Sequence, residues 1–329
     1  MAARLGWLSL VIGLLVVVAV ASVALGVRLV GWHDLLTGLG GADGTSDQAA
    51  VVKRVPRTVL ALLVGASLGL AGAVLQGATR NPLADPGLLG ITNGASLAVV
   101  SGIAFFGLSS PSSYVWVAIA GAGAAAVFVY FVGSLGRGGA TPLKLTLAGA
   151  ACGAAFSSLV SAILLPRIDV MNQFRFWQIG GVGGGSWDLL AQIVPFLAVG
   201  ALLSLGSARG LNTLALGDDV AAGLGQRVAT TRVVAALGAV VLCGAATSAA
   251  GPIAFVGLIV PHLCRLLVGV DHRWLLPSCV LAGALLLTAA DVAGRLVARP
   301  AEVDVGIMTA LLGAPVFIAI VRRQRMRAL

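Results

Sequence analysis

The sequence has few charged residues. Only 10% of its 329 residues are Asp, Glu, Lys or Arg, against roughly 25% in an average soluble domain. Apolar residues make up 59%, so too few charges remain to cover the surface of a soluble protein of this length. The composition excludes a cytosolic enzyme, a disordered chain and a disulfide scaffold, and it predicts an all-α polytopic membrane protein.

Residue types that carry catalysis are equally scarce. The chain has only two lysines, Lys53 and Lys144, and neither completes a phosphate-binding P-loop. The three histidines lack metal-ligand spacing, and no Ser/His/Asp arrangement can be traced. We therefore expect no catalytic residues, no metal site and no cofactor bound by the chain. The basic residues stand singly between apolar runs, so we do not expect a nucleic-acid partner. We expect these residues to contact membrane lipid instead.

Long uncharged runs are what the sequence has in abundance. A membrane-spanning helix needs about 20 apolar residues, and the runs, divided at turn clusters, accommodate ten helices in one transmembrane domain over 1–329. An even number places both termini on one side, and the arginine-rich tail from Arg322 to Arg327 indicates that this side is the cytoplasm. The predicted spans are approximately 5–28, 57–79, 92–108, 113–134, 143–165, 189–207, 230–249, 253–269, 273–298 and 305–321.

Two charge features stand out against this topology. Lys53, Arg54 and Arg57 fall on the outer side, where basic residues are usually depleted. Asp291 is the best candidate for an acidic residue within the bilayer, and Arg295 follows it by four residues, so the two can pair on one helical face. A structural pair is the favoured interpretation. The alternative is an ion-coupled secondary transporter that uses Asp291 to carry the ion.

One internal similarity is visible in the glycine and arginine spacing. Gly72 to Arg80 and Gly257 to Arg265 have the same separation, and each is expected at the inner end of a helix. Many transporters contain internal repeats, and this similarity is a weak indication of one.

Several motifs in order resemble those of the FecCD family, the permease subunits of ABC importers for iron-siderophores, haem and vitamin B12. The resemblance covers about residues 50 to 321. It is carried by Arg54 to Thr58, Gln76 to Gly90, Leu216 to Gly225, Gly251 to His262 and Gly306 to Pro315.

This resemblance implies a fold, a location and a set of partners. The fold is that of a type II ABC importer permease in the bacterial cytoplasmic membrane. The implied partners are a second permease subunit in a homo- or heterodimer, two ABC ATPase subunits that carry ATP and Mg²⁺, and an extracytoplasmic substrate-binding protein. An iron-siderophore is the first choice of substrate, and haem and cobalamin remain alternatives.

The resemblance also suggests roles for individual residues. Asp218 and Asp219 suit the start of a short helix, and such a helix on the inner surface would receive the ATPase. The predicted coupling residues are Gly217, Asp218, Asp219, Ala221, Leu224 and Gly225. Docking of the binding protein is predicted for Arg54, Arg57 and Arg295, whose guanidinium groups suit carboxylates. A cytoplasmic gate is predicted at Thr141, Pro142 and Leu143. The mouth of the pathway is predicted at Phe174, Phe176 and Trp177, with an interfacial aromatic belt as the equal alternative.

Overall fold

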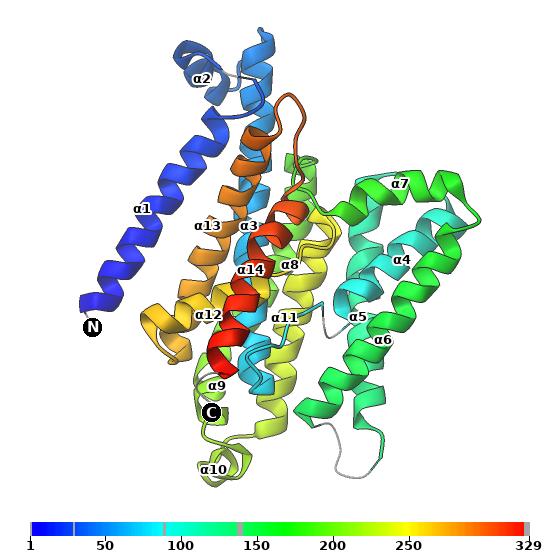
Figure 1. Ribbon diagram of the computed structural model, residues 1–329, viewed down its shortest axis with the longest axis vertical. Coiled ribbons are helices and arrows are strands. Elements are labelled where there is room, and N and C mark those ends of the chain that lie inside the picture. Colours follow the sequence, from blue (N-terminus) through cyan, green and yellow to red (C-terminus); the bar gives the residue numbers. More distant parts are fainter. Residues whose placement is uncertain (1, 29, 88–89, 137–140, 326–329) are drawn as a thin grey trace.

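The structure, a computed structural model, describes residues 2–28, 30–87, 90–136 and 141–325, and every regular element in these ranges is a helix (Figure 1). The principal helices are α1 (Ala2–Ala24), α3 (Ser46–Thr79), α4 (Ile91–Phe106), α5 (Pro111–Ser134), α6 (Pro142–Leu164), α8 (Trp187–Gly206), α11 (Val228–Ala250), α12 (Val256–Val268), α13 (His272–Val297) and α14 (Val305–Arg325). Four shorter helices connect them: α2 (Trp32–Leu39), α7 (Ile168–Ile179), α9 (Ala208–Leu214) and α10 (Asp218–Gly223).

The helix lengths agree with the predicted fold class. In the described residues, 7 helices are long and apolar enough to cross a membrane, and α4, α12 and α14 supply shorter apolar segments. One predicted boundary is wrong, because α3 begins at Ser46 rather than near residue 57. The Thr45 hydroxyl accepts a hydrogen bond from the Gln48 backbone N–H, and the Gln48 side chain accepts one from the Thr45 N–H. This capping box starts the helix well before the apolar run.

Helix α3 lies at the centre of one half of the molecule and packs through glycines. About 78% of its apolar segment is buried, against 11% for α1. Gly65 and Gly69 lie against the backbone of α13, where a Cβ on Gly65 would collide with the Gly283 carbonyl oxygen. Small residues let membrane helices approach closely without a hydrophobic driving force, so these glycines set the distance between α3 and α13.

The two segments with matching glycine and arginine spacing cross in the structure. A Cβ on Gly72 of α3 would collide with the carbonyl oxygen of Gly257, in the first turn of α12. One turn later, Gln76 Nε2 donates to the Gly257 carbonyl at 3.1 Å, and Arg265 Nη1 donates to Gln76 Oε1 at 2.6 Å. The similarity in sequence therefore corresponds to one contact between α3 and α12.

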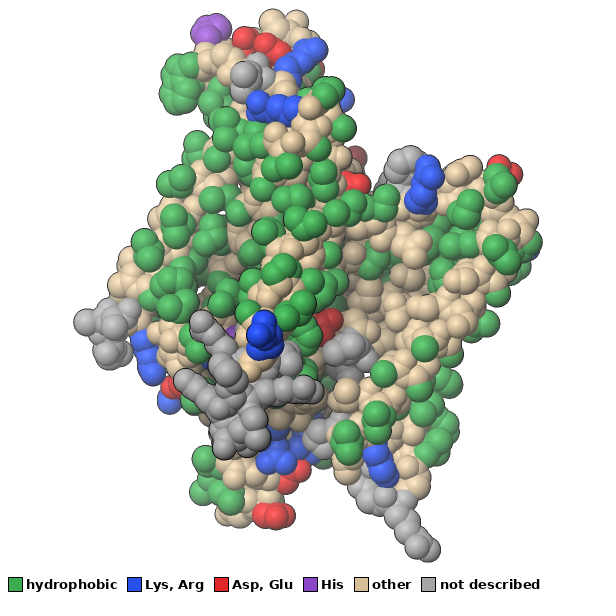
Figure 2. Space-filling view, viewed as in Figure 1, with side chains coloured by type: hydrophobic (Ala, Val, Ile, Leu, Met, Phe, Trp, Pro, Cys, Tyr) green, Lys and Arg blue, Asp and Glu red, His purple; other side chains and the backbone are tan. Residues whose placement is uncertain are grey.

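The remaining helices form a second group beside this centre. Figure 1 shows α4, α5, α6 and α7 together at the right, with α8 and α11 between them and α3. On the face seen in Figure 2, apolar side chains cover the middle of the molecule, and charged side chains gather mainly toward its two ends. We call these the α2 end and the α10 end, after the short helices that they carry. Both chain termini lie in the half of the molecule nearer the α10 end (Figure 1).

Candidate functional sites at the two ends of the bundle

The α10 end presents a short helix with an apolar outer surface. Gly217 and Gly225, at φ +108° and +79°, adopt the left-handed backbone that glycine permits and bracket α10. Leu216, Val220 and Leu224 are 62%, 51% and 66% exposed. Val220 lies within α10, and Leu216 and Leu224 flank its two ends; we call these three exposed residues the α10 apolar stripe. Leucines this exposed at a charged end of the bundle suit a protein partner.

Charge pairs hold α10 to the rest of the bundle. Asp218 Oδ1 accepts a hydrogen bond from Arg232 Nη2 of α11 at 2.9 Å and lies 3.8 Å from Arg80 Nη2 at the end of α3. Arg232 Nε also donates to the carbonyl of Ala78, in the last turn of α3. Ala221 is fully buried beneath the helix. Asp218 and its two arginines thus connect α10 to both α3 and α11.

The segment between α3 and α4 consists of two turns built by acidic and amide side chains. Arg80, at φ 50°, ends α3 in a left-handed conformation. Asn81 Oδ1 then accepts a hydrogen bond from the Leu83 N–H at 3.0 Å, and Asp85 Oδ1 accepts one from the Gly87 N–H at 2.8 Å. Each is a side-chain turn of the kind that Asn and Asp favour. The proline that follows each of these residues, Pro82 and Pro86, cannot continue a helix, so the chain turns here.

At the α2 end, three arginines bind the backbone where α1 ends. Arg54 donates to the carbonyls of Val23, Ala24 and Arg28 at 2.8–3.3 Å. Arg295 donates to the carbonyls of Ser22 and Leu25, and Arg299 to that of Gly26. The last carbonyls of a helix have no partner within it, and its negative end favours cations. These arginines thus cap α1.

A second set of contacts ties the same end together through acidic residues. Asp291, which is 1% exposed, lies between Arg57 Nη2 at 2.8 Å and Arg295 Nη2 at 2.9 Å. Arg57 Nη1 also pairs with Glu302 at 2.7 Å. The predicted pairing of Asp291 with Arg295 is present, and Arg57 adds a link from α3 to α13 that sequence spacing could not reveal.

Two aromatic residues of α7, Phe174 and Trp177, pack against each other. Phe174 is fully buried and lies 5.5 Å from Trp177 between ring centroids. Trp177 Nε1 donates to the Ser248 carbonyl of α11 at 3.3 Å. The side chain of Phe176 lies outside the described part of the protein. Phe174 and Trp177 therefore fasten α7 to α11, and a role at the pathway mouth remains a prediction.

The predicted gate lies at the start of α6. Thr141 is exposed, and its hydroxyl accepts a hydrogen bond from the Lys144 N–H at 3.3 Å, so it caps the helix. Leu143 is 70% exposed, whereas the Pro142 side chain and residues 137–140 lie outside the described residues. An exposed leucine beside a helix cap is compatible with a gate, which remains a prediction.

Among the described residues, no group of three His, Cys, Asp or Glu side chains could hold a metal ion. The four cysteines are buried free thiols. Asp291, the acid singled out in the sequence, is already shared by two guanidinium groups. Asp291 thus serves as a link between α3 and α13.

Comparison with known proteins places these features in a family. The model of the FecCD transport family matches residues 14–323. The chain belongs to the FecCD transport family. The resemblance seen in the motifs is confirmed, and a FecCD protein is a component of a transport system rather than an enzyme.

Individual FecCD relatives cover nearly the same length. The chain is 46% identical to the ferric enterobactin transport permease FepD of Escherichia coli, over 94% of this chain and 93% of the relative. It is 39% identical to the hemin transport permease HmuU of Yersinia pestis, over 83% and 82%. An inward-facing structure assigned to the metal-chelate ABC transporter type matches with a TM-score of 0.82 and 30% identity, over 98% of both chains. The predicted permease fold is confirmed.

The FecCD assignment does not test the roles of individual residues, which remain predictions. The three arginines predicted to dock the binding protein differ in how much of each side chain is exposed. Arg54 is 8% exposed and Arg295 1% exposed, and both are occupied by α1 carbonyls. Arg57 keeps 15% of its side chain exposed beside Glu302. Lys53, which was absent from the predicted docking set, is exposed next to them. Lys53 and Arg57 are thus the more accessible of these basic residues, Arg54 and Arg295 are the more buried, and docking by Arg54, Arg57 and Arg295 remains a prediction.

Proposed function

We propose that the protein is the permease subunit of a bacterial ABC importer that carries an iron-siderophore complex inward, driven by a separate ATPase subunit. The observation that carries this proposal is the α10 apolar stripe on a helix anchored to α3 and α11 by Asp218. A surface that is apolar, exposed and mechanically tied to the central helices suits a subunit that delivers force. ATP and Mg²⁺ would bind on that partner, and this chain would hold no cofactor.

The orientation follows from the charges and the chain ends. Both termini lie in the half of the molecule nearer the α10 end (Figure 1), and the last turns of α14 carry Arg322, Arg323 and Arg325. We therefore assign the α10 end to the cytoplasm of the inner membrane. Two ATPase subunits would dock there, and an extracytoplasmic binding protein would meet Lys53 and Arg57 at the α2 end.

A second permease subunit would complete the pathway. Helices α6 and α14 both face the viewer in Figure 1, and each has exposed apolar side chains, such as Leu147 on α6 and Leu311 on α14 at 61% and 66% exposure. Pairing these faces across a two-fold axis would enclose a path between the subunits. The predicted gate at Thr141, Pro142 and Leu143 would close that path at the α10 end.

Relatives supply the substrate class. The similarity to FepD favours an iron-siderophore, and the lower similarity to HmuU keeps haem as the second candidate. Both are bulky chelates. The scarcity of charge inside the membrane segments suits their release, because a path with few charged groups offers few strong contacts to hold them.

Uptake of ⁵⁵Fe in cells that express the complete transport system tests the proposal. We expect ATP-dependent uptake of a ferric siderophore that is lost in Leu224→Asp, because a charge in the apolar stripe opposes docking of the ATPase. Ala222→Asp adds the same charge at an exposed position outside the stripe and should retain uptake. Uptake that persists in Leu224→Asp, or that collapses with an ion gradient while ATP is maintained, would overturn the proposal.

A further inference from the structure

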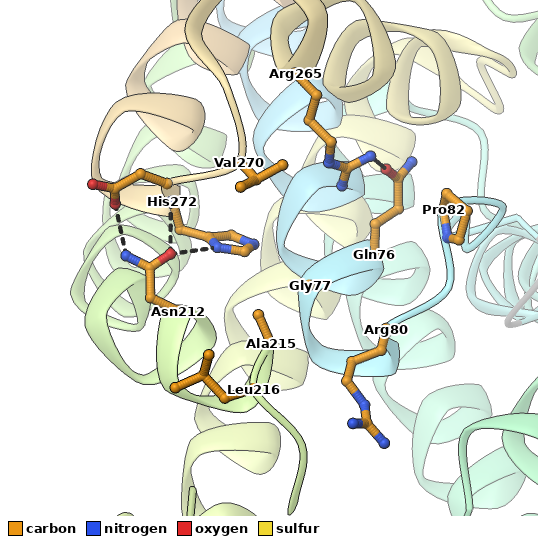
Figure 3. Close-up of a pocket in the computed structure, with 11 residues that line it drawn as sticks. Gln76, Gly77, Arg80, Pro82, Asn212, Ala215, Leu216, Arg265, Val270 and His272 are labelled. Carbon is orange, nitrogen blue, oxygen red and sulfur yellow. Dashed lines mark hydrogen bonds between the residues drawn. The ribbon is translucent and has the colours of Figure 1, made fainter. Parts of the chain in front are cut away.

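A pocket of about 490 Å³ opens at the α10 end, between the end of α3, α9 and the turn that joins α12 to α13 (Figure 3). The proposed function uses two residues at its edge, Leu216 in the α10 apolar stripe and Arg80 beside Asp218, and gives no role to the pocket itself. Its wall carries two arginines, Arg80 and Arg265, and a histidine, His272. Figure 3 shows these side chains coming from three different elements around one space.

Arg265 carries a positive charge that no acid in the described chain neutralises. Its Nη1 donates to Gln76 Oε1 at 2.6 Å, and Gln76 is fixed by its own bond to the Gly257 carbonyl. No carboxylate of the described residues pairs with it. Arg80 lines another part of the wall, with 42% of its side chain exposed and only a 3.8 Å contact to Asp218. Two guanidinium groups therefore border the pocket with donors to spare.

The histidine in the wall of the pocket is held in place by Asn212. Asn212 Oδ1 accepts from the His272 backbone N–H, and it lies 2.8 Å from His272 Nδ1. An amide oxygen only accepts, so Nδ1 carries a hydrogen and Nε2 of the neutral ring is an acceptor. Nε2 is buried without a partner against Gly77, and His272 is 6% exposed. Nε2 therefore faces the α3 backbone rather than the open space, and His272 shapes the wall without offering a polar group to a ligand.

One acid also lines the pocket, and it is already occupied. Hydrogen bonds from Arg273 and Asn212 lower the pKa of Asp271 to about 2. Asn212 Nδ2 donates to Asp271 Oδ1 at 2.6 Å, and Arg273 Nε does so at 3.2 Å. This carboxylate is ionised at neutral pH but faces its own donors, so the cations of Arg80 and Arg265 remain available.

Exposed apolar residues accompany the pocket-lining residues of α12 and of the turn after it: Val270 lines the pocket, and Leu266 follows Arg265 in the chain. Leu266 and Val270, on α12 and the turn after it, are 72% and 74% exposed. Arg4 reaches the same turn, within 3.4 Å of where a Cβ of Gly269 would lie, and stacks 5.9 Å from the Trp274 ring. Exposed leucine and valine beside clustered arginines match the two parts of a phospholipid, its acyl chains and its phosphate.

We propose that this pocket binds the phosphate of an anionic phospholipid of the adjoining leaflet, with a glycerol-phosphate headgroup such as that of phosphatidylglycerol. The phosphate would lie between Arg265 and Arg80. The acyl chains would follow Leu266 and Val270. Any effect of the bound lipid on α10 rests on the proposed function; binding itself does not.

Native mass spectrometry of the purified full chain tests the site, using phosphatidylglycerol titrated against zwitterionic phosphatidylethanolamine. We expect phosphatidylglycerol to bind more tightly, and Arg80→Gln and Arg265→Gln each to weaken it about fivefold. Arg227→Gln, an exposed arginine at the same end, is the matched control and should bind normally. Arg265→Lys keeps the charge and should bind better than Arg265→Gln, which separates loss of charge from a folding defect.

Competition with inorganic phosphate identifies the source of the ligand. If millimolar phosphate leaves the lipid bound, the ligand is a headgroup. If phosphate alone binds, and Arg80→Gln abolishes that binding, the pocket is a phosphate site filled from solution. Equal lipid binding by the wild type and both pocket variants, or equal loss in Arg227→Gln, would overturn the proposal. No ATPase is needed, so either result leaves the proposed transport function untouched.

Discussion

Asp291 on α13 accepts two hydrogen bonds from Arg57 on α3, at 3.2 Å from Nε and 2.8 Å from Nη2, across 234 positions of sequence. Arg295 binds the other carboxylate oxygen at 2.9 Å. The carboxylate is 1% exposed, so two cations compensate its burial. This arrangement makes Asp291 a structural link between helices and disfavours a role in carrying a proton.

Replacing Asp291 with Asn should therefore destabilise the protein without changing its energy source. Breaking a buried ion pair by removing one partner costs about 3–5 kcal/mol, because two guanidinium groups lose their counter-ion. Thermal unfolding in detergent measures the loss. Asp47→Asn removes an exposed pair with Arg28 at the same end and should change stability by less than about 1 kcal/mol. A stable Asp291→Asn variant that no longer transports would instead favour ion coupling.

Arg54 and its neighbour Lys53 should respond differently to the same substitution. Arg54→Gln removes the cap on three carbonyls at the end of α1, and hydrogen bonds to a charged group are worth about 1.5–3 kcal/mol. Lys53 is exposed, so Lys53→Gln should leave the melting temperature unchanged. A pull-down with the binding protein should show the opposite order, with weaker binding for Lys53→Gln. Equal melting temperatures for the two variants would refute the capping role of Arg54.

The close approach of α3 and α12 at Gly72 can be tested with two glycine variants. A Cβ on Gly72 would collide with the Gly257 carbonyl, whereas nothing lies within 4 Å of a Cβ on Gly123 in α5. Gly72→Ala should cost about 1–3 kcal/mol through overpacking. Gly123→Ala should be neutral or slightly stabilising. Unfolding in denaturant compares them, and equal stability would show that the helices can separate without cost.

Much of this architecture could be predicted from the sequence, because uncharged runs and prolines determine where membrane helices begin and end. The start of α3 was missed because its first turns are polar, although Thr45 and Gln48 carry the spacing of a capping box. The short helix α2 was missed as well. Its apolar side chains lie on both sides, with Leu35 buried and Trp32 and Leu36 exposed. The helix is also too short to give a clear periodic signal in the sequence.

The charged sites were less predictable than the helices. Arg54, Arg57 and Arg295 look alike in sequence, yet their partners differ in the structure. Arg54 binds backbone carbonyls, and Arg57 binds Asp291 and Glu302. Arg295 binds Ser22 and Asp291. These partners lie on other helices, so sequence spacing carries no signal for them. The stripe of Leu216, Val220 and Leu224 could have been found from its spacing of four, but only Leu224 was singled out.

Asp218 offers a test of how α10 is connected to the bundle. Its carboxylate is 41% exposed, so Asp218→Asn should change stability by less than about 1 kcal/mol. The link to Arg232 and Arg80 would be weakened, and we expect ATP hydrolysis to continue while uptake falls. Parallel assays of ATPase activity and ⁵⁵Fe uptake in reconstituted vesicles measure both. A proportional fall of the two activities would argue against a transmitting role.

The central claim is that α10 receives a separate ATPase, and co-purification tests it most directly. The tagged protein would be isolated from its host in mild detergent beside the Leu224→Asp variant, and the recovered subunits identified by mass spectrometry. We predict a P-loop ATPase in an amount equal to the wild-type chain and a strong loss of it from Leu224→Asp. Wild-type protein recovered without an ATPase, under conditions that preserve other ABC complexes, would contradict the account.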